Sequence, residues 1–297
     1  MEIAMADGYD SGVEIDDIHF ISVDHTLSDR VYNHGRYYQA SNLGRHPFPI
    51  DEREKERQCR QFAACHQLFQ GRTSLTSIGN LRTVLDIKAG AGNWAIQFAE
   101  ENPSSVVYGI DNVPMQEEWV PSNCEFLIDD LVETDWYSPF LGVDFIHIGE
   151  LRGDYDLLTS ILDGAYRCCS PGGSIEIWDN TLKFHDPNGA SALHRLWRDM
   201  DNAYSMDGRS LNLPLMYPEE IERFGFVNVV ETAYHLPLNL SFPDPATQLV
   251  ASWADGLEAY GTELLSRHLG KHHFQILIEC AAARQAIRQG VEGWLQM

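Results

Sequence analysis

Short apolar runs that end in acidic residues recur along the middle of the chain. The runs are Val84–Ile87, Val106–Asp111 and Cys124–Ile128, and the last is followed directly by Asp129 and Asp130. A small-residue turn over 88–92 and a helix-like segment over 94–101 separate the first run from the second. Apolar strands that alternate with turns and helices are typical of a parallel sheet built from βαβ units.

The rest of the chain continues this alternation. Further strands are predicted over 143–148, 174–179, 224–230 and 233–238, and helices over 51–68, 156–168 and 190–204. The last fifty residues have helical periodicity. We therefore predict an α/β fold with a Rossmann-like, seven-stranded, mostly parallel sheet. Residues 1–70 would form an N-terminal extension or lid, and residues 71–297 a core domain with C-terminal helices.

The turn after the first strand indicates a nucleoside-binding site. Gly90 and Gly92 lack a Cβ, so the backbone can approach a ligand closely. Asp111 follows about twenty residues later, the spacing at which a βαβ unit places a carboxylate on ribose hydroxyls. A carboxylate there would repel a 2′-phosphate, which disfavours NADP.

Three strand ends with acids favour a cationic ligand without phosphates, and we predict S-adenosylmethionine (SAM) as the cofactor. Any one of these residues alone would be interpreted as an ordinary strand-end aspartate. Three such aspartates at the ends of consecutive strands favour a ligand site instead. The predicted cofactor-binding residues are Asp86, Lys88, Gly90, Gly92, Trp94, Asp111, Asn112, Asp129 and Asp130.

Composition narrows the function further. The chain has 297 residues, 44% of them hydrophobic, which is enough to bury a full core. A formal net charge of −23 argues against a nucleic-acid partner. No apolar run approaches the ~20 residues of a membrane span, and the acidic N-terminus lacks the features of a signal peptide. Six scattered cysteines without a CxxC pair favour reduced thiols, and we predict a cytoplasmic protein.

Several motifs together resemble the fungal LaeA-like group of class I SAM-dependent methyltransferases. They are YxxGxY (Tyr32, Gly35, Tyr37), PxDExExxR (Pro49 to Arg57), LD…GxGxW (Leu85 to Trp94), GxD (Gly109 to Asp111), WVPxNCxF…DD (Trp119 to Asp130), DFIH (Asp144 to His147) and PGG (Pro171 to Gly173). The resemblance implies methylation of a small-molecule acceptor in secondary metabolism, on oxygen or carbon. It also allows a nuclear location and a homodimer.

The chain departs from this family pattern at four places. Lys88 replaces a glycine, Gly149 replaces an arginine two residues after the DFIH histidine, and Ser170 replaces a lysine. An extra segment, 39–48, separates the aromatic element from the acidic one. Lys88 and Gly149 fall at strand ends that frame the expected pockets.

Lys88 has three interpretations. Its ammonium can pair with the cofactor carboxylate, it can occupy part of the SAM pocket, or its stem can lie along the sheet with the charge in solvent. We expect the first, because the downstream acids are all present. On that interpretation Lys88→Gly weakens SAM binding, whereas relief of an obstruction would tighten it.

The catalytic candidates are His147 and Glu150. An imidazole titrates near neutrality and can take a proton from an acceptor, but His147 can equally hydrogen-bond the strand-end backbone. Glu150 and Arg152 can orient a substrate or form a solvated ion pair. Trp178 and Asn180, after the fifth strand, are predicted to line the acceptor pocket.

The N-terminal aromatic residues Tyr32, His34 and Tyr37 are predicted to contact substrate as part of a lid that excludes water. Packing of the N-terminal segment is the alternative. The twelve histidines show no HExxH or similar spacing, so no metal is predicted. His272 and His273 are expected on the surface of the terminal helices.

Two other functions remain open. One is a methyltransferase-fold enzyme that catalyses a cyclisation or rearrangement of a natural-product intermediate without methylating it, motivated by Lys88 and Gly149. The other is a non-catalytic regulator that binds protein partners, for which a blocked pocket and a large exposed apolar patch would be the signature.

Overall fold

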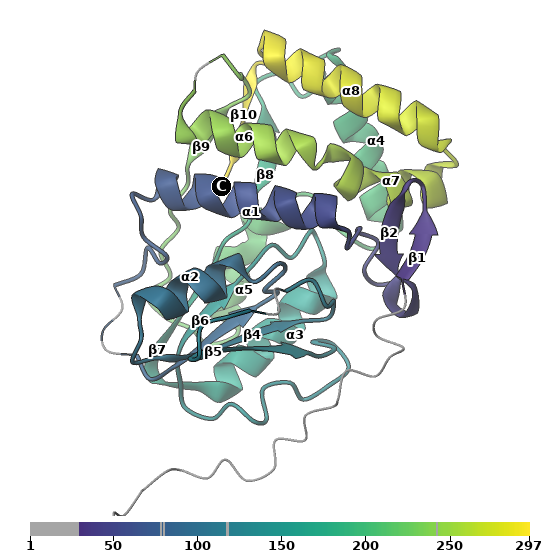
Figure 1. Cartoon of the computed structure of the whole chain (residues 1–297). Coiled ribbons are helices and arrows are strands. Elements are labelled where there is room, and N and C mark those ends of the chain that lie inside the picture. The colour runs from purple at the N-terminus through teal and green to yellow at the C-terminus, as the bar shows by residue number, and fades with distance from the viewer. Residues whose placement is uncertain (1–29, 78, 80, 117–118, 242) are drawn as a thin grey trace, which may run out of the picture.

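A five-stranded parallel sheet forms the centre of the protein (Figure 1). The computed structural model describes residues 30–77, 79, 81–116, 119–241 and 243–297, so the acidic N-terminus lies outside the described residues. The strands, in the order in which they lie side by side, are β5 (Cys124–Ile128), β4 (Val106–Asp111), β3 (Thr83–Ile87), β6 (Val143–Ile148) and β7 (Cys169–Ile177). The parallel α/β prediction is confirmed.

The expected strand number is wrong. Among the described residues no sixth or seventh strand joins this sheet, and 224–230 forms no strand. The 233–238 region contributes β9 (His235–Pro237), which pairs instead with β10 (Gly293–Gln296). With β8 (Thr181–Phe184) these form a separate three-stranded antiparallel sheet. Leu236 pairs with Leu295, and both are buried. The hydrophobic pattern around Leu236 does not predict this pairing, because Leu295 is far away along the chain.

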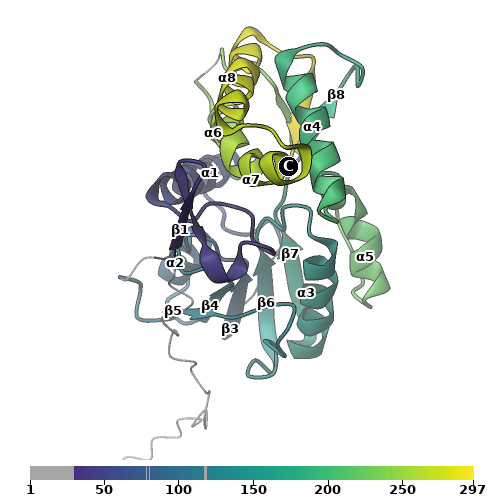
Figure 2. The ribbon, with the colours of Figure 1, turned by 90° about the vertical axis from the view of Figure 1, so that its right-hand side faces the viewer.

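Helices cover both faces of the sheet (Figure 2), and alternating side chains of the strands pack under them. Val84 packs with Trp94 and Phe98 of α2 (Asn93–Glu101), whereas Leu85 packs with Leu158 of α3 (Tyr155–Cys168). Successive residues of a strand point to opposite faces, which explains this division. Because all five strands are parallel, their carboxyl ends lie along one edge of the sheet.

A second layer of helices covers that edge (Figure 1). It contains α1 (Glu52–Leu68), α4 (Ala192–Met206), α6 (Pro245–Asp255), α7 (Leu257–Leu269) and α8 (His273–Gln289), and the short α5 (Tyr217–Arg223) lies beside α3. Asp51 caps α1 by accepting a hydrogen bond from Glu54 N. Ala64 and Cys65 of α1 belong to the same apolar cluster as the C-terminal helices. The division at residue 70 stays a prediction.

Candidate functional site

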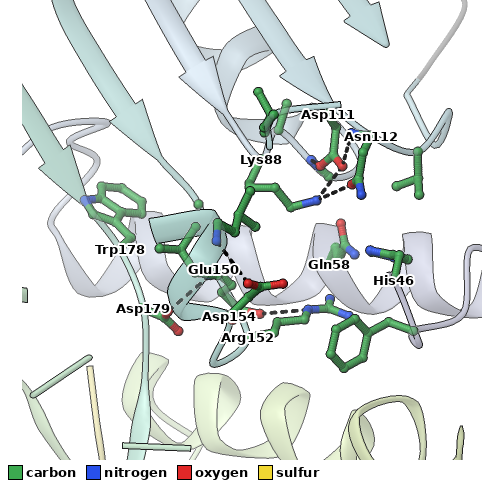
Figure 3. A pocket seen from close by; sticks show the side chains of 18 of the residues that line it. His46, Gln58, Lys88, Asp111, Asn112, Glu150, Arg152, Asp154, Trp178 and Asp179 are labelled. Carbon is green, nitrogen blue, oxygen red and sulfur yellow. Dashed lines mark hydrogen bonds and ion pairs between the residues drawn. The ribbon is translucent and has the colours of Figure 1, made fainter. Parts of the chain in front are cut away.

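A cavity of about 480 Å³ lies at the carboxyl ends of β3, β4 and β6, beneath the helical layer (Figure 3). Of the predicted site residues, twelve line it: Asp86, Lys88, Gly90, Trp94, Asp111, Asn112, Asp130, His147, Glu150, Arg152, Trp178 and Asn180. Gly92, Asp129, Tyr32, His34 and Tyr37 are not among its lining residues. The sequence therefore located lining residues that follow the strands, but not those of segments 44–48, 57–65 and 207–209.

Two glycines shape the turn after β3. Gly90 has φ +57° and Gly92 has φ +83°, in the left-handed region that favours glycine. A Cβ on Gly90 would lie 2.5 Å from Gln58 Oε1, and one on Gly92 would lie 2.5 Å from the Phe126 ring. Gly92 therefore serves packing at the start of α2, whereas Gly90 lies at the cavity.

Lys88 occupies the position of the expected first glycine and adopts φ +61°. Its ammonium lies 2.6 Å from Asp111 Oδ1 and 2.7 Å from Asn112 Oδ1 (Figure 3), and its side chain is 9% exposed. The interpretation that places its charge in solvent is wrong. Asp111, itself buried, also accepts hydrogen bonds from Gly90 N and Asn112 N. The carboxylate expected to bind ribose is thus occupied by donors of the protein.

Two of the four departures from the family pattern, Lys88 and Gly149, are in contact. A Cβ on Gly149 would lie 2.6 Å from the backbone oxygen of Lys88. The left-handed conformation of Lys88 therefore directs its carbonyl into the space that a side chain at position 149 would need. A glycine at 149 accommodates the lysine at 88.

Gly149→Ala is expected to lower the free energy of unfolding by about 1–3 kcal/mol, the usual cost of forcing an atom into a packed site. The added methyl meets backbone rather than a flexible side chain, so relief requires movement of the loop. Chemical denaturation would measure the change. Gly44→Ala is the control, because no atom lies within 4 Å of the corresponding Cβ. Equal stabilities of the two variants would contradict the coupling.

Asp86 and His147 form a buried pair rather than two independent site residues. His147 Nδ1 lies 2.7 Å from Asp86 Oδ1, and the imidazole stacks on Trp94 with centroids 4.1 Å apart. Trp178 packs edge-on against the same ring at 5.0 Å. Burial raises the pKa of Asp86, and the His147 hydrogen bond opposes that change. His147 Nε2 and Asp86 Oδ2 are buried and have no hydrogen-bond partner among the described residues.

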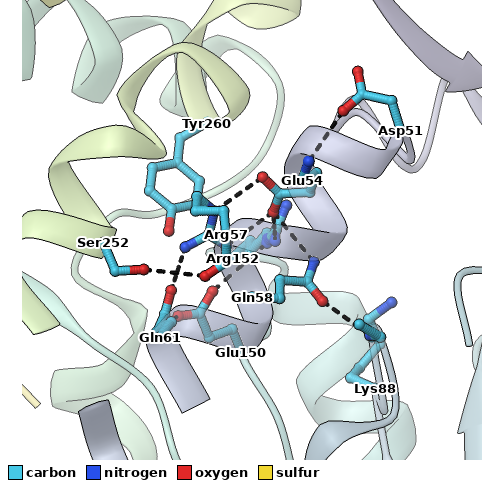
Figure 4. A network of polar contacts seen from close by, with 12 residues as sticks. Asp51, Glu54, Arg57, Gln58, Gln61, Lys88, Glu150, Arg152, Ser252 and Tyr260 are labelled. Carbon is cyan, nitrogen blue, oxygen red and sulfur yellow. Dashed lines mark hydrogen bonds and ion pairs between the residues drawn. The ribbon is translucent and has the colours of Figure 1, made fainter. Parts of the chain in front are cut away.

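Glu54 organises a buried ionic network at the roof of the cavity (Figure 4). Its Oε1 accepts hydrogen bonds from Arg57 at 2.8 Å and from Arg152 at 2.9 Å. Burial opposes its ionisation, but the two arginines lower the pKa of Glu54 to about 2. Arg152 lies over the Phe48 ring at 4.7 Å, with its Nε 3.8 Å from Glu150. The solvated ion pair considered for Glu150 and Arg152 is wrong, because Arg152 is buried against Glu54.

Polar side chains after β6 and β7 form the opposite wall of the cavity. Glu150 Oε1 accepts hydrogen bonds from Gln61 Nε2 and, at 2.8 Å, from Asn180 Nδ2. Asp179 accepts from the Tyr217 hydroxyl and from the backbone N–H groups of Leu151 and Asn180. Trp178 lies beside them (Figure 3). This wall therefore carries two carboxyl groups, and uncharged groups donate the hydrogen bonds that position them.

The predicted aromatic lid lies away from the cavity. Tyr32 and Tyr37, on β1 (Arg30–Asn33) and β2 (Arg36–Gln39), are 64% and 46% exposed and pack on each other. His34 stacks on His273 of α8, so packing explains this hairpin better than substrate contact does. The hairpin also contacts the helical layer through Asn33, which donates to Glu263.

The extra segment 39–48 reaches the cavity instead. Arg45 pairs with Asp130 at 2.9 Å, and His46 and Phe48 line the cavity. Burial, followed by nearby cations, holds the pKa of His46 well below its usual value, so its imidazole is neutral. Asp129 accepts from Asp130 N and Thr134 Oγ1, which makes it part of its own loop.

Sequence reasoning missed several residues of the cavity wall. They are His46, Phe48, Arg57, Gln58, Gln61, Asp154, Asp179 and Arg209. One signal was available, because Glu54, Gln58 and Gln61 recur at the i, i+4, i+7 spacing of one helix face. The others come from segments whose packing depends on the tertiary fold.

The part of the chain that the structure describes contains neither a candidate metal site nor a candidate membrane-spanning helix. Its histidine, cysteine, aspartate and glutamate side chains include no group of three or more placed to hold a metal ion. None of its helices combines the length and the apolar character needed to cross a membrane. All six cysteines are free thiols.

Comparison with known proteins identifies relatives, although no family model matches the chain. Methyltransferase pytC of Aspergillus terreus is 26% identical over 252 residues, which cover 80% of this chain and 76% of pytC. The secondary metabolism regulator laeA of Aspergillus niger is 29% identical, covering 78% of this chain and 63% of the regulator. The protein-methionine methyltransferase laeA of Emericella nidulans is 32% identical, covering 74% of this chain and 60% of that protein.

A solved structure supports the fold. Phosphoethanolamine N-methyltransferase 2 of Haemonchus contortus, in complex with S-adenosyl-L-methionine, superposes with a TM-score of 0.50. The match covers 90% of this chain and 59% of that chain at 14% identity, a level that supports similarity of fold alone.

Proposed function

Since the chain belongs to the LaeA-like methyltransferase family, we propose that it transfers the methyl group of SAM to a small-molecule acceptor of secondary metabolism. The observation that carries this proposal is the single cavity that joins Asp111 and the Gly90 turn to the polar wall of Glu150 and Asn180. Ligands of open α/β sheets bind at the carboxyl ends of the strands, where this cavity lies. We propose oxygen or carbon as the methylated atom.

The residues of the cavity fit SAM on one condition. Asp111 presents a buried carboxylate at the end of β4, and Gly90 lines the cavity beside it, next to the Gln58 side chain. Both carboxylate oxygens already accept hydrogen bonds, and Lys88 donates to Oδ1, so a ribose hydroxyl can use that oxygen only after the ammonium withdraws. When bound, the sulfonium supplies an electrophilic methyl group. Asp130 is proposed to face the adenine amine.

The proposed acceptor side contains Glu150, Arg152, Trp178 and Asn180. Asn180 orients Glu150 by donating to Oε1, and Arg152 is fixed by Glu54, so this wall is preorganised. His147 stays a candidate base. Its Nε2 is buried and has no partner in the described part of the chain, whereas Asp86 holds the other ring nitrogen and would fix the tautomer. Opening of the space around Trp94 or Trp178 would be needed for its use.

Asp111→Ala is expected to weaken SAM binding by about 1.5–3 kcal/mol, the scale for hydrogen bonds to a charged group. Calorimetric titration with SAM and with S-adenosylhomocysteine measures this loss and tests the proposed function itself. Asp163→Ala, which removes an exposed aspartate of α3, is the control. Unchanged affinity in Asp111→Ala would show that the carboxylate is structural only.

The Lys88–Asp111 ion pair supports a second candidate function. A lysine that keeps this carboxylate from ribose would leave a repurposed cyclisation or rearrangement enzyme, or a non-catalytic regulator. Wild-type protein that binds no SAM, but binds it after Lys88→Gly, would favour these alternatives. The cytoplasmic or nuclear location and the homodimer stay predictions.

A further inference from the structure

Glu150 and Asp179 share a wall of the cavity, and neutral groups provide their hydrogen bonds. Side-chain amides donate to Glu150, and a hydroxyl and two backbone N–H groups donate to Asp179. Among the described residues, the nearest ion-pair contact of Glu150 is Arg152 Nε at 3.8 Å, and Asp179 has no ion pair. Arg152 is itself 2.9 Å from Glu54. The charge of the pair is therefore only partly compensated.

A smaller cavity of about 40 Å³ adjoins the same two carboxyl groups. Both acids line it, together with Asn180 and Tyr260. Tyr260 is 8% exposed. Its hydroxyl is buried and has no hydrogen-bond partner among the described residues. Buried hydroxyls are nearly always paired, so this one indicates a polar ligand or a water next to the two acids.

We propose that Glu150 and Asp179 form a proton-accepting pair in the acceptor subsite, so that the acceptor loses a proton when it is methylated. This inference rests on the proposed function and narrows its substrate class. Hydroxyl groups and acidic carbon atoms carry such a proton. A thioether carries none and needs no base.

The step balances without a further reactant. The acceptor atom forms a bond to the methyl carbon as the carbon–sulfur bond breaks and its electron pair stays on sulfur. The O–H or C–H bond of the acceptor breaks, and its electrons remain with the acceptor. The proton passes to the Glu150 carboxylate, which becomes a neutral carboxylic acid. The products are the methylated acceptor, the neutral thioether and one proton bound to Glu150.

The electrostatics of the pair suit this role. Burial, followed by the charge of Glu150, raises the pKa of Asp179 to about 7, and the Tyr217 hydrogen bond opposes the rise. Other titratable or charged groups around the pair are Arg57, Cys65, Arg152, Tyr204 and Tyr260. Below pH 7 the pair already carries one proton, so methyl transfer is expected to rise with pH through about 7.

Two substitutions should move this pH profile in opposite directions. In Asp179→Asn, the carboxyl group with a pKa of about 7 is absent, so the rising limb moves to lower pH. We expect kcat to fall by about 10²-fold, the smaller effect expected of a general base. In Tyr217→Phe, Asp179 loses the donor that favours its ionised form, so the limb moves to higher pH. Asp255→Asn, at an exposed site paired with Arg60, is the control and should leave the limb in place.

The experiment uses the full chain, radiolabelled SAM and three probes: catechol, acetylacetone and N-acetylmethionine amide. Methylation of catechol or acetylacetone, with the two opposite shifts, is the expected result. Methylation of the thioether probe alone, or of no probe by protein that binds SAM, would overturn the proposal. A pH profile unchanged in both variants would also overturn it.

Carbon-13 NMR titration of the labelled carboxyl groups gives a readout that does not depend on turnover. A carboxyl signal that titrates near pH 7 and disappears in Asp179→Asn is expected. Two carboxyl groups that both titrate in the acid range would contradict the pairing. SAM calorimetry on the same samples distinguishes failure of the proposed function from failure of this inference. Absence of SAM binding refutes the proposed function, whereas the NMR titration tests the Glu150–Asp179 pair.

Discussion

Replacing Lys88 with glycine is expected to tighten SAM binding by about 10- to 100-fold. The Lys88 ammonium lies 2.6 Å from Asp111 Oδ1, and both side chains are almost fully buried. Hydrogen bonds to a charged group contribute about 1.5–3 kcal/mol, and ribose can use this oxygen only after the bond breaks. Removing the lysine removes that cost, and about 1.4 kcal/mol corresponds to a factor of ten.

The sign of this effect differs from the expectation drawn from sequence. An ammonium that paired with the cofactor carboxylate would make Lys88→Gly weaken binding, but the structure shows the ammonium on Asp111 and Asn112. Lys88→Met tests the same point while keeping the length of the side chain, and Lys183→Met on β8 is the control. Calorimetry that found weaker binding in both Lys88 variants would show that the lysine turns toward the cofactor when SAM binds.

Glu54→Gln is expected to lower the free energy of unfolding by about 3–5 kcal/mol, the cost of leaving buried charges without their partner. Arg57 and Arg152 both contact Glu54 Oε1, and the side chains of Glu54 and Arg57 are 1% and 3% exposed. The amide of glutamine carries no charge to balance these two guanidinium groups. Glu56→Gln, at an exposed position on the same helix, is the control and should change stability little.

The effect of Glu54 should depend on pH with a defined sign. Its pKa is lowered from 4.5 to about 2 in the folded protein, so its stabilising contribution is present above pH 4.5. That contribution is lost as the pH falls toward 2, where the folded protein also binds the proton. Denaturation of the wild type and Glu54→Gln over this range should therefore give converging stabilities. A constant difference down to pH 2 would show that Glu54 acts through packing instead.

Local sequence pattern by itself determined the central α/β architecture. Apolar runs such as Val106–Asp111 form strands because alternate side chains are buried under helices on both faces. The predicted helix over 51–68 begins within one residue of α1, and the structure shows the local reason, because the Asp51 carboxylate accepts a hydrogen bond from Glu54 N. The position of Asp111 at a strand end followed from spacing alone. These features depend on neighbours along the chain, and the sequence contains those neighbours.

Contacts between distant segments were decided only by the tertiary structure. The sheet stops at five strands because β9 pairs with β10, nearly sixty residues away along the chain. Lys88 donates a hydrogen bond to Asp111, and Arg152 donates one to Glu54, which lies 98 positions earlier in the chain. Asp179 accepts a hydrogen bond from the Tyr217 hydroxyl. A charged side chain in a buried site takes the partner that folding brings within reach, since desolvation makes an unpaired charge too costly. The sequence states which groups are present, and the packing of the helical layer on the sheet determines which of them meet.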